Sequence, residues 1–336
     1  MLRGARTSQQ VPECRHLTRL WSEPVPGPCL RLRSSNHLHF KPYALSVAVA
    51  QLSSRYAVNI SRDRTQNQLE STVTWLVMLG RFGRLLFSLA IIAIGVETLI
   101  CSYGSSHKVV PVIPWLPAIP SLALLVGTIF ILCGAGLLFR RTLVVSSIVL
   151  GVVMLLCGLA FDVPRHPDLM SAPWRTNVLE PIAISCLAWL ASGLGAIPEW
   201  LYRTSRYLFA FVLIIFGIAH FQVLTLIASM VPGWIPWHWF WTVFFGVAFI
   251  AAGVSFATGF LQRWAALGVG LMFALWTLTI HIPPVLNCFR TSGAAQDPDK
   301  WSDVFIVAAL WGGSWALAPV LRDRKDLSSG ADSNRA

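Results

Sequence analysis

The sequence predicts an all-α integral membrane protein with eight transmembrane helices, arranged as two tandem four-helix bundles. The first observation is composition, because 55% of the 336 residues are apolar and only 12% are charged. A typical soluble domain has about 25% charged residues. The second is a series of apolar runs, each close to the ~20 residues that a bilayer core requires. The third is a set of Pro, Gly and Trp positions that recurs in both halves of the chain.

Residues 1–77 differ from the rest of the chain. They are rich in Arg, Ser, Pro and Gln and have no sustained helical or strand periodicity. Their only apolar run, Tyr43 to Leu52, is too short to span a bilayer. Two interpretations are open: a disordered basic leader, or a natural start at or near Met78. We assign no site to this segment.

Eight apolar runs follow, and each is expected to be helical because backbone N–H and C=O groups find no other partners in lipid. The expected spans are 82–100, 115–139, 143–161, 178–197, 207–230, 237–261, 265–282 and 304–321. Pro283-Pro284 is expected to stop the seventh helix. The resulting parts are the leader 1–77, a first membrane unit 78–200, a second membrane unit 201–322 and a polar tail 323–336.

The basic residues predict the orientation. Ten lie in short segments next to helix ends on one set of loops: Arg81, Arg84, Arg140, Arg141, Arg203, Arg206, Arg263, Arg322, Arg324 and Lys325. The opposite loops carry five, mixed with aspartates. The positive-inside rule then places both ends of the membrane part in the cytoplasm. The net charge of +11 is accordingly assigned to loops at the bilayer and not to nucleic-acid binding.

The stretch from Gly217 to Gly246 predicts a transmembrane hairpin. Two prolines and a glycine between Val231 and Pro236 indicate a chain reversal. Four tryptophans lie in or beside this turn and predict an aromatic belt at the membrane surface: Trp234, Trp237, Trp239 and Trp241.

The two halves repeat each other in order. Arg84–Gly95 aligns with Arg206–Gly217 and Ile113–Trp115 with Ile235–Trp237, both at an offset of 122. Gly127, Gly134 and Asp162-Val163-Pro164 align with Gly246, Gly253 and His281-Ile282-Pro283 at an offset of 119. These marks indicate a duplication, and an even number of helices per unit makes the repeats parallel. We expect two bundles side by side about an axis near the membrane normal.

Four ionisable residues fall within or at the ends of the apolar runs: Glu97, Asp162, His220 and His281. A charged group at membrane depth is costly unless it is paired or hydrated, so each is a candidate for a polar site toward the outer leaflet. Such a site could transfer protons or bind a quinone headgroup. The alternative is structural, since Asp162 and His281 each precede an X-Pro pair whose freed carbonyls need donors.

Other cofactors and motifs are disfavoured. A haem between His220 and His281 has no further support in the sequence, and the cysteines show no metal-ligand spacing. We therefore assign no metal ligand and no catalytic residue. A disulfide between Cys101 and Cys288 stays open, because both fall on one expected side of the membrane.

The second half resembles the DoxX-like family of bacterial membrane proteins. The resembling residues are Phe216–Phe221, Val231–Pro236, Phe240-Trp241, Gly246, Ala252-Gly253 and Trp276–Pro283. The first half looks like a diverged copy with Thr98 opposite His220, so the chain would be a tandem form. The resemblance implies a membrane fold and an association with redox metabolism, but no reaction.

Three functions remain open. The first is an accessory subunit in membrane redox metabolism that contacts quinone or a redox partner subunit through His220 and His281. The second is a small-solute or lipid transporter with a polar cleft between the bundles. The third is a non-catalytic membrane scaffold.

Overall fold

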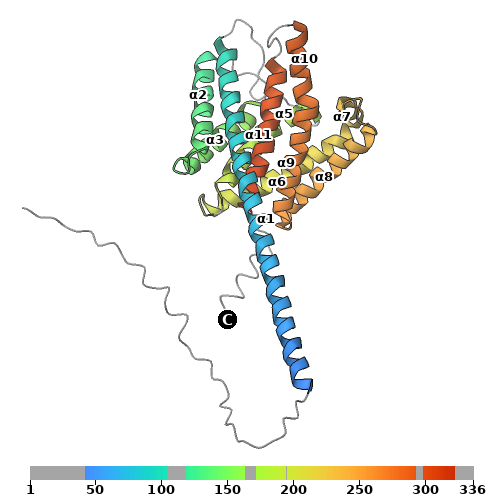
Figure 1. Cartoon of the computed structure of the whole chain (residues 1–336). Helices are drawn as coiled ribbons and strands as arrows, with labels where there is room; N and C mark the ends of the chain where they lie inside the picture. Colours follow the sequence, from blue (N-terminus) through green and yellow to red (C-terminus); the bar gives the residue numbers. More distant parts are fainter. Residues whose placement is uncertain (1–41, 104–118, 163–171, 194, 293–297, 322–336) are drawn as a thin grey trace, which may run out of the picture. The chain divides into compact units, whose positions relative to one another are not determined.

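The computed structural model describes the backbone of residues 42–103, 119–162, 172–193, 195–292 and 298–321, and side chains within 71–101, 119–159, 176–193, 195–287 and 300–321. These residues are helical with short turns, and no strand is assigned among them (Figure 1). The prediction of an all-α protein is therefore confirmed. The chain divides into two compact units, 1–62 and 63–336. The second unit holds every side chain described below.

Helix α1 runs over 62 residues, Pro42–Tyr103. The expected first span, 82–100, lies within this helix, which begins at Pro42. Pro42 is accommodated because the first helical position needs no intrahelical N–H donor. Between Pro42 and Val77 the sequence has no Gly and no further Pro to interrupt the helix.

Five helical segments in the described part of the chain are long and apolar enough to cross a membrane: Ser71–Cys101, Pro120–Leu137, Glu199–Gln222, His238–Thr258 and Gln262–Asn287. Leu143–Leu159 and Thr176–Ser192 are shorter apolar helices. The multi-pass character predicted from composition is thereby supported by five such helices, against the eight spans expected. The last expected span corresponds to α11 (Pro298–Leu317), which begins with polar residues including Lys300 and Asp303.

Two helices change into π-helix before they end. Helix α3 (Leu143–Leu156) continues as η2 (Cys157–Asp162). Helix α9 (Gln262–Trp276) continues as η3 (Thr277–His281) and then α10 (Ile282–Ser292). Pro283-Pro284 therefore does not stop the helix, contrary to expectation. In a regular α-helix a proline ring clashes with the carbonyl group four residues earlier, and the helix loses the hydrogen bond of the missing N–H. The wider π turn before the prolines changes the local hydrogen-bond pattern and so accommodates them.

The predicted hairpin is formed by α6 (Glu199–Gln222), α7 (Leu224–Met230) and α8 (His238–Thr258). The expected helix 207–230 begins earlier and breaks at Val223, whose φ of −117° and ψ of 40° are not helical. The reversal follows at the Pro-Gly stretch, as predicted. Trp237 precedes α8 with a left-handed φ of 59°.

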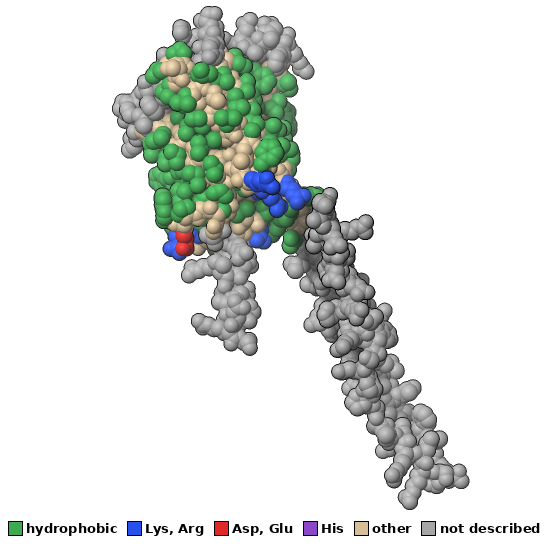
Figure 2. Space-filling view, turned by 90° about the vertical axis from the view of Figure 1, so that its left-hand side faces the viewer, with side chains coloured by type: hydrophobic (Ala, Val, Ile, Leu, Met, Phe, Trp, Pro, Cys, Tyr) green, Lys and Arg blue, Asp and Glu red, His purple; other side chains and the backbone are tan. Residues whose placement is uncertain are grey.

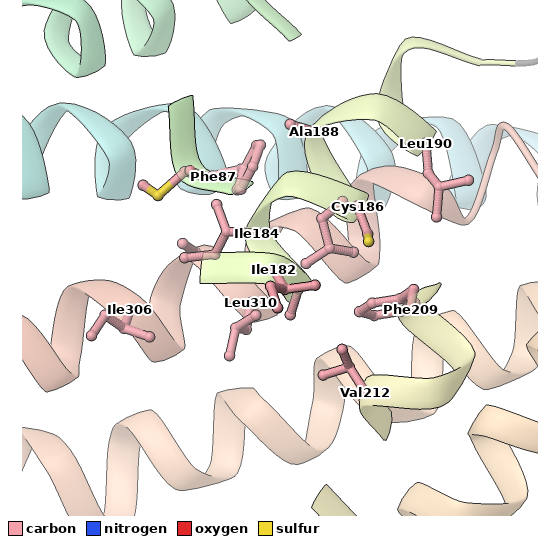
Figure 3. Close-up of a cluster of buried hydrophobic side chains, with 14 of the residues drawn as sticks. Phe87, Ile182, Ile184, Cys186, Ala188, Leu190, Phe209, Val212, Ile306 and Leu310 are labelled. Atoms are coloured by element: carbon pink, nitrogen blue, oxygen red, sulfur yellow. The ribbon is translucent and has the colours of Figure 1, made fainter. Parts of the chain in front are cut away.

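The two halves share one hydrophobic core. Helix α2 (Pro120–Leu137) packs on α3, α3 on α5 (Ala172–Ser192), α6 on α8, and α9 on α11. Helix α5 also packs on α6 and α11, so contacts cross between the halves. Phe87, Ile184, Phe209 and Leu310 lie in the same buried cluster, which draws on α1, α5, α6 and α11 (Figure 3). The contacts of α5 with α6 and α11 join the two expected side-by-side units in one core.

Glycines set the close helix contacts in both halves. A Cβ on Gly95 would lie 2.7 Å from the carbonyl oxygen of Gly127, and a Cβ on Gly217 would lie 2.6 Å from that of Gly246. Gly83 and Gly312 likewise bring α1 against α11. Small residues let helix backbones approach this closely where lipid supplies no hydrophobic driving force.

A tryptophan on the fourth helix of each half binds the third helix. The Nε1 of Trp189 donates to the carbonyl oxygen of Ile148 at 3.4 Å, and that of Trp315 donates to Leu267 at 3.2 Å. Gly151 lies under the Trp189 indole, and Gly270 lies under that of Trp315. The pair α3 and α5 and the pair α9 and α11 therefore pack through the same kind of contact, a tryptophan over a glycine.

Candidate functional site

His220 lies in the last turn of α6 and is only 5% exposed. Its Nδ1 is 2.7 Å from the carbonyl oxygen of Phe216. Because a carbonyl only accepts, Nδ1 carries the proton, and Nε2 is the acceptor of the neutral ring. This Nε2 is buried and has no hydrogen-bond partner within the described residues. A buried polar atom of this kind is uncommon and calls for a ligand, a water or a catalytic role.

The imidazole is enclosed by aromatic side chains from two other helices. Its centroid is 5.4 Å from the ring of Phe249 on α8 and 5.3 Å from that of Trp276 on α9. Phe273 extends this aromatic group, with its ring 5.5 Å from Phe249. Gly246 lets α8 approach α6 closely at His220, since a Cβ there would be 3.0 Å from the Cβ of His220. The site is thus one nitrogen acceptor in an apolar, π-rich surrounding.

Thr98 occupies the corresponding position on α1. It is 1% exposed, and its hydroxyl donates to the carbonyl oxygen of Ile94 at 2.7 Å. The first half therefore has a short hydroxyl where the second has an imidazole.

Glu97, the residue before Thr98, lies against α11. Its carboxylate is 8% exposed and accepts a hydrogen bond of 2.6 Å from the hydroxyl of Ser302. The bond joins residues 205 apart in the sequence. The side chain of Asp162, the other candidate carboxylate of the first half, lies outside the described residues.

The sequence analysis did not single out a second carboxylate, Glu180, which lies near the contact between α1 and α11. Glu180 on α5 interacts electrostatically with Asp303 on α11, the residue after Ser302. Glu180 falls near the start of the expected span 178–197, immediately before Pro181. An acidic residue in that position is typical of a helix boundary. An ionisable residue two positions inside an apolar run was the signal that could have found it.

His281 is half-buried at the end of η3. Across the residues with described side chains, no hydrogen bond or ring contact joins it to His220. In the same residues no three His, Cys, Asp or Glu side chains are placed to hold a metal ion. The expected pairing of the two histidines therefore remains a prediction.

The predicted aromatic belt is largely exposed. Trp234, Trp237 and Trp239 are 75%, 77% and 56% exposed, and Trp241 donates from Nε1 to the carbonyl oxygen of Pro236 at 3.1 Å. A pocket of about 500 Å³ opens beside them, between α7 and the start of α8. Thr225, Ser229 and His238 supply its polar side chains.

Fold and site together define an all-helical protein with several membrane-capable helices and a histidine enclosed by aromatic rings. Comparison of the chain with models of protein families, with curated proteins and with solved structures finds no match.

Proposed function

We propose that this protein is a multi-pass protein of the bacterial inner membrane, built from two DoxX-like four-helix units with its termini in the cytoplasm. The apolar segments in the described part of the chain support a membrane location. The glycine and tryptophan contacts common to both halves support the duplication. On this proposal α3 with η2, α5 and α11 are the three further spans.

Within this frame the protein serves membrane redox metabolism by binding a quinone headgroup at His220. The observation that carries the proposal is the buried Nε2 of His220 without a hydrogen-bond partner. A hydroquinone hydroxyl could donate to such an acceptor, and the rings of Trp276 and Phe249 suit a flat aromatic headgroup. The residues present therefore fit the group. His281 would act with His220 only if it reaches the same ligand.

The test is the quinone content of the purified full-length protein, measured by extraction and mass analysis beside an ultraviolet–visible spectrum. We expect bound quinone in the wild type and its loss in His220→Leu. Thr98→Val is the matched control, because Thr98 has the same position and the same hydrogen bond in the other half. His281→Ala tests whether His281 contacts the quinone, because bound quinone is lost in this variant only if it does. A quinone-free wild type, or equal loss in Thr98→Val, would contradict the proposal.

A second candidate is a structural role without a ligand. The Ser302–Glu97 hydrogen bond favours it, because that bond satisfies a carboxylate oxygen by linking α1 to α11. In that case His220→Leu would leave every ligand measurement unchanged.

A further inference from the structure

Arginines of the first half gather where α1 meets the turn between α2 and α3. Arg81 and Arg84 lie on α1, and Arg140 and Arg141 lie in the turn that precedes Leu143. Arg140 and Arg81 are the like charges that act on the guanidinium of Arg84. Arg84 is half-buried, while the other three are exposed.

These four arginines have no acidic partner among the residues whose side chains are described. Like charges held together without a counter-charge repel one another, and this repulsion is relieved when an anion binds. The Nε of Arg84 is also buried without a hydrogen-bond acceptor. The cluster therefore presents exposed guanidinium groups whose positive charge has no acidic partner among the described side chains.

Exposed apolar side chains adjoin the arginines. Phe82, Leu85 and Leu89 are 45%, 46% and 51% exposed and follow one face of α1. Leu138 and Phe139, just before Arg140, are 40% and 65% exposed. Figure 2 shows Lys and Arg side chains at one end of an extensive apolar surface. A ligand that suits both parts has an anionic head and hydrocarbon chains.

The second half lacks this arrangement although its first helix also carries two arginines. Arg203 pairs with Glu199 on the same helix. The Arg206 guanidinium lies 4.7 Å from the centre of the Tyr207 ring. It is also close to Gly259, the residue that aligns with Arg140 in the expected repeat. Arg263 donates to the carbonyl oxygen of Leu321 at 3.0 Å. Arg203, Arg206 and Arg263 thus each have a contact within the protein, although the Nε atoms of Arg206 and Arg263 are, like that of Arg84, buried without a hydrogen-bond partner.

We propose that Arg81, Arg84 and Arg140 form a binding site for the phosphate headgroup of an anionic phospholipid. Guanidinium groups donate paired hydrogen bonds to phosphate oxygens, and their charge is retained at any physiological pH. Basic pockets on the cytoplasmic side of membrane proteins bind lipid headgroups in this way. The site is independent of His220 and requires only that the chain lies in a bilayer.

The test is native mass spectrometry of the full-length protein in nonionic detergent, titrated with phosphatidylglycerol or with phosphatidylcholine of the same acyl chains. We expect the wild type to retain phosphatidylglycerol preferentially. Each arginine replaced by glutamine should weaken that binding about fivefold, which corresponds to ~1 kcal/mol per arginine near an anionic lipid surface. Arg203→Gln with Arg206→Gln is the matched control and should leave the preference unchanged.

Arg81 and Arg84 lie within the membrane-capable segment Ser71–Cys101, so Arg140→Gln alone serves as the second variant, in an exposed turn. Arg140→Lys should restore part of the affinity because the charge returns. Equal retention of the two lipids by the wild type would overturn the proposal. So would unchanged binding in Arg140→Gln, or an equal loss in the control variant.

Discussion

Thr98 and His220 make the same contact, each placing a polar side-chain atom 2.7 Å from the carbonyl oxygen four residues earlier on its own helix. The threonine hydroxyl donates its one proton in that bond. The imidazole has a second nitrogen, which extends beyond the helix into a group of aromatic rings. At this position the two side chains therefore differ in the second ring nitrogen of His220, which has no hydrogen-bond partner within the described residues.

Stability and ligand binding should separate at His220. His220→Leu removes a buried acceptor that lacks a partner in the protein. The apolar replacement should therefore leave the free energy of unfolding within about 1 kcal/mol of the wild-type value. Bound quinone should nevertheless disappear. Thermal unfolding in detergent and quinone extraction from the same sample check both parts. A large loss of stability would instead identify His220 as a packing residue.

Gly217 should tolerate no side chain. A Cβ at this position would lie 2.6 Å from the carbonyl oxygen of Gly246, so Gly217→Ala should force α6 and α8 apart and cost about 1–3 kcal/mol. Gly95→Ala should behave alike in the first half. The control is Gly268→Ala, because no atom lies within 4 Å of its Cβ position. That variant should unfold at the wild-type temperature or above, and equal effects at Gly217 and Gly268 would contradict the close contact.

The Ser302 hydroxyl should stabilise the seam between α1 and α11. Ser302→Ala removes a hydrogen bond to a carboxylate, so we expect a loss of about 1.5–3 kcal/mol in the free energy of unfolding. The double variant with Glu97→Ala should be less destabilised than the sum of the single changes. Additive losses in this cycle would mean that the two side chains act separately.

Trp189 and Trp315 should contribute equally to the stability of the folded protein. Trp189→Phe and Trp315→Phe each delete an indole donor to a carbonyl oxygen while keeping an aromatic ring over Gly151 or Gly270. We expect each to lower stability by about 1 kcal/mol. Chemical unfolding followed by circular dichroism measures both. A marked inequality would argue against equivalent packing of the two halves.

Much of the helical architecture follows from local sequence. Apolar runs identify most of the helices, and Pro232-Gly233 predicts the reversal between α7 and α8 because its backbone preferences act within a few residues. The prediction that Pro283-Pro284 ends a helix was wrong, because the π turn of η3 that accommodates the prolines has no local sequence signature. Helix α1 was missed before Phe82 because that segment lacks an apolar period.

The candidate site was predictable only in part. His220 could be found because it is an ionisable residue inside an apolar run. Its aromatic neighbour Trp276 is distant in sequence, so their contact depends on how α6 and α9 pack. The same holds for Glu97 and Ser302, and for Glu180 with Asp303, whose proximity is a property of three helices together.

The close approach of Gly83 to Gly312 has a consequence for biosynthesis. Helix α1 leaves the ribosome before α11, with several helices between them. The small-residue face of α1 around Gly83 must therefore wait in the bilayer until α11 has been translated. Insertion of the individual helices and their final assembly are then separate events, and the interval between them is set by the length of chain that connects the two glycines.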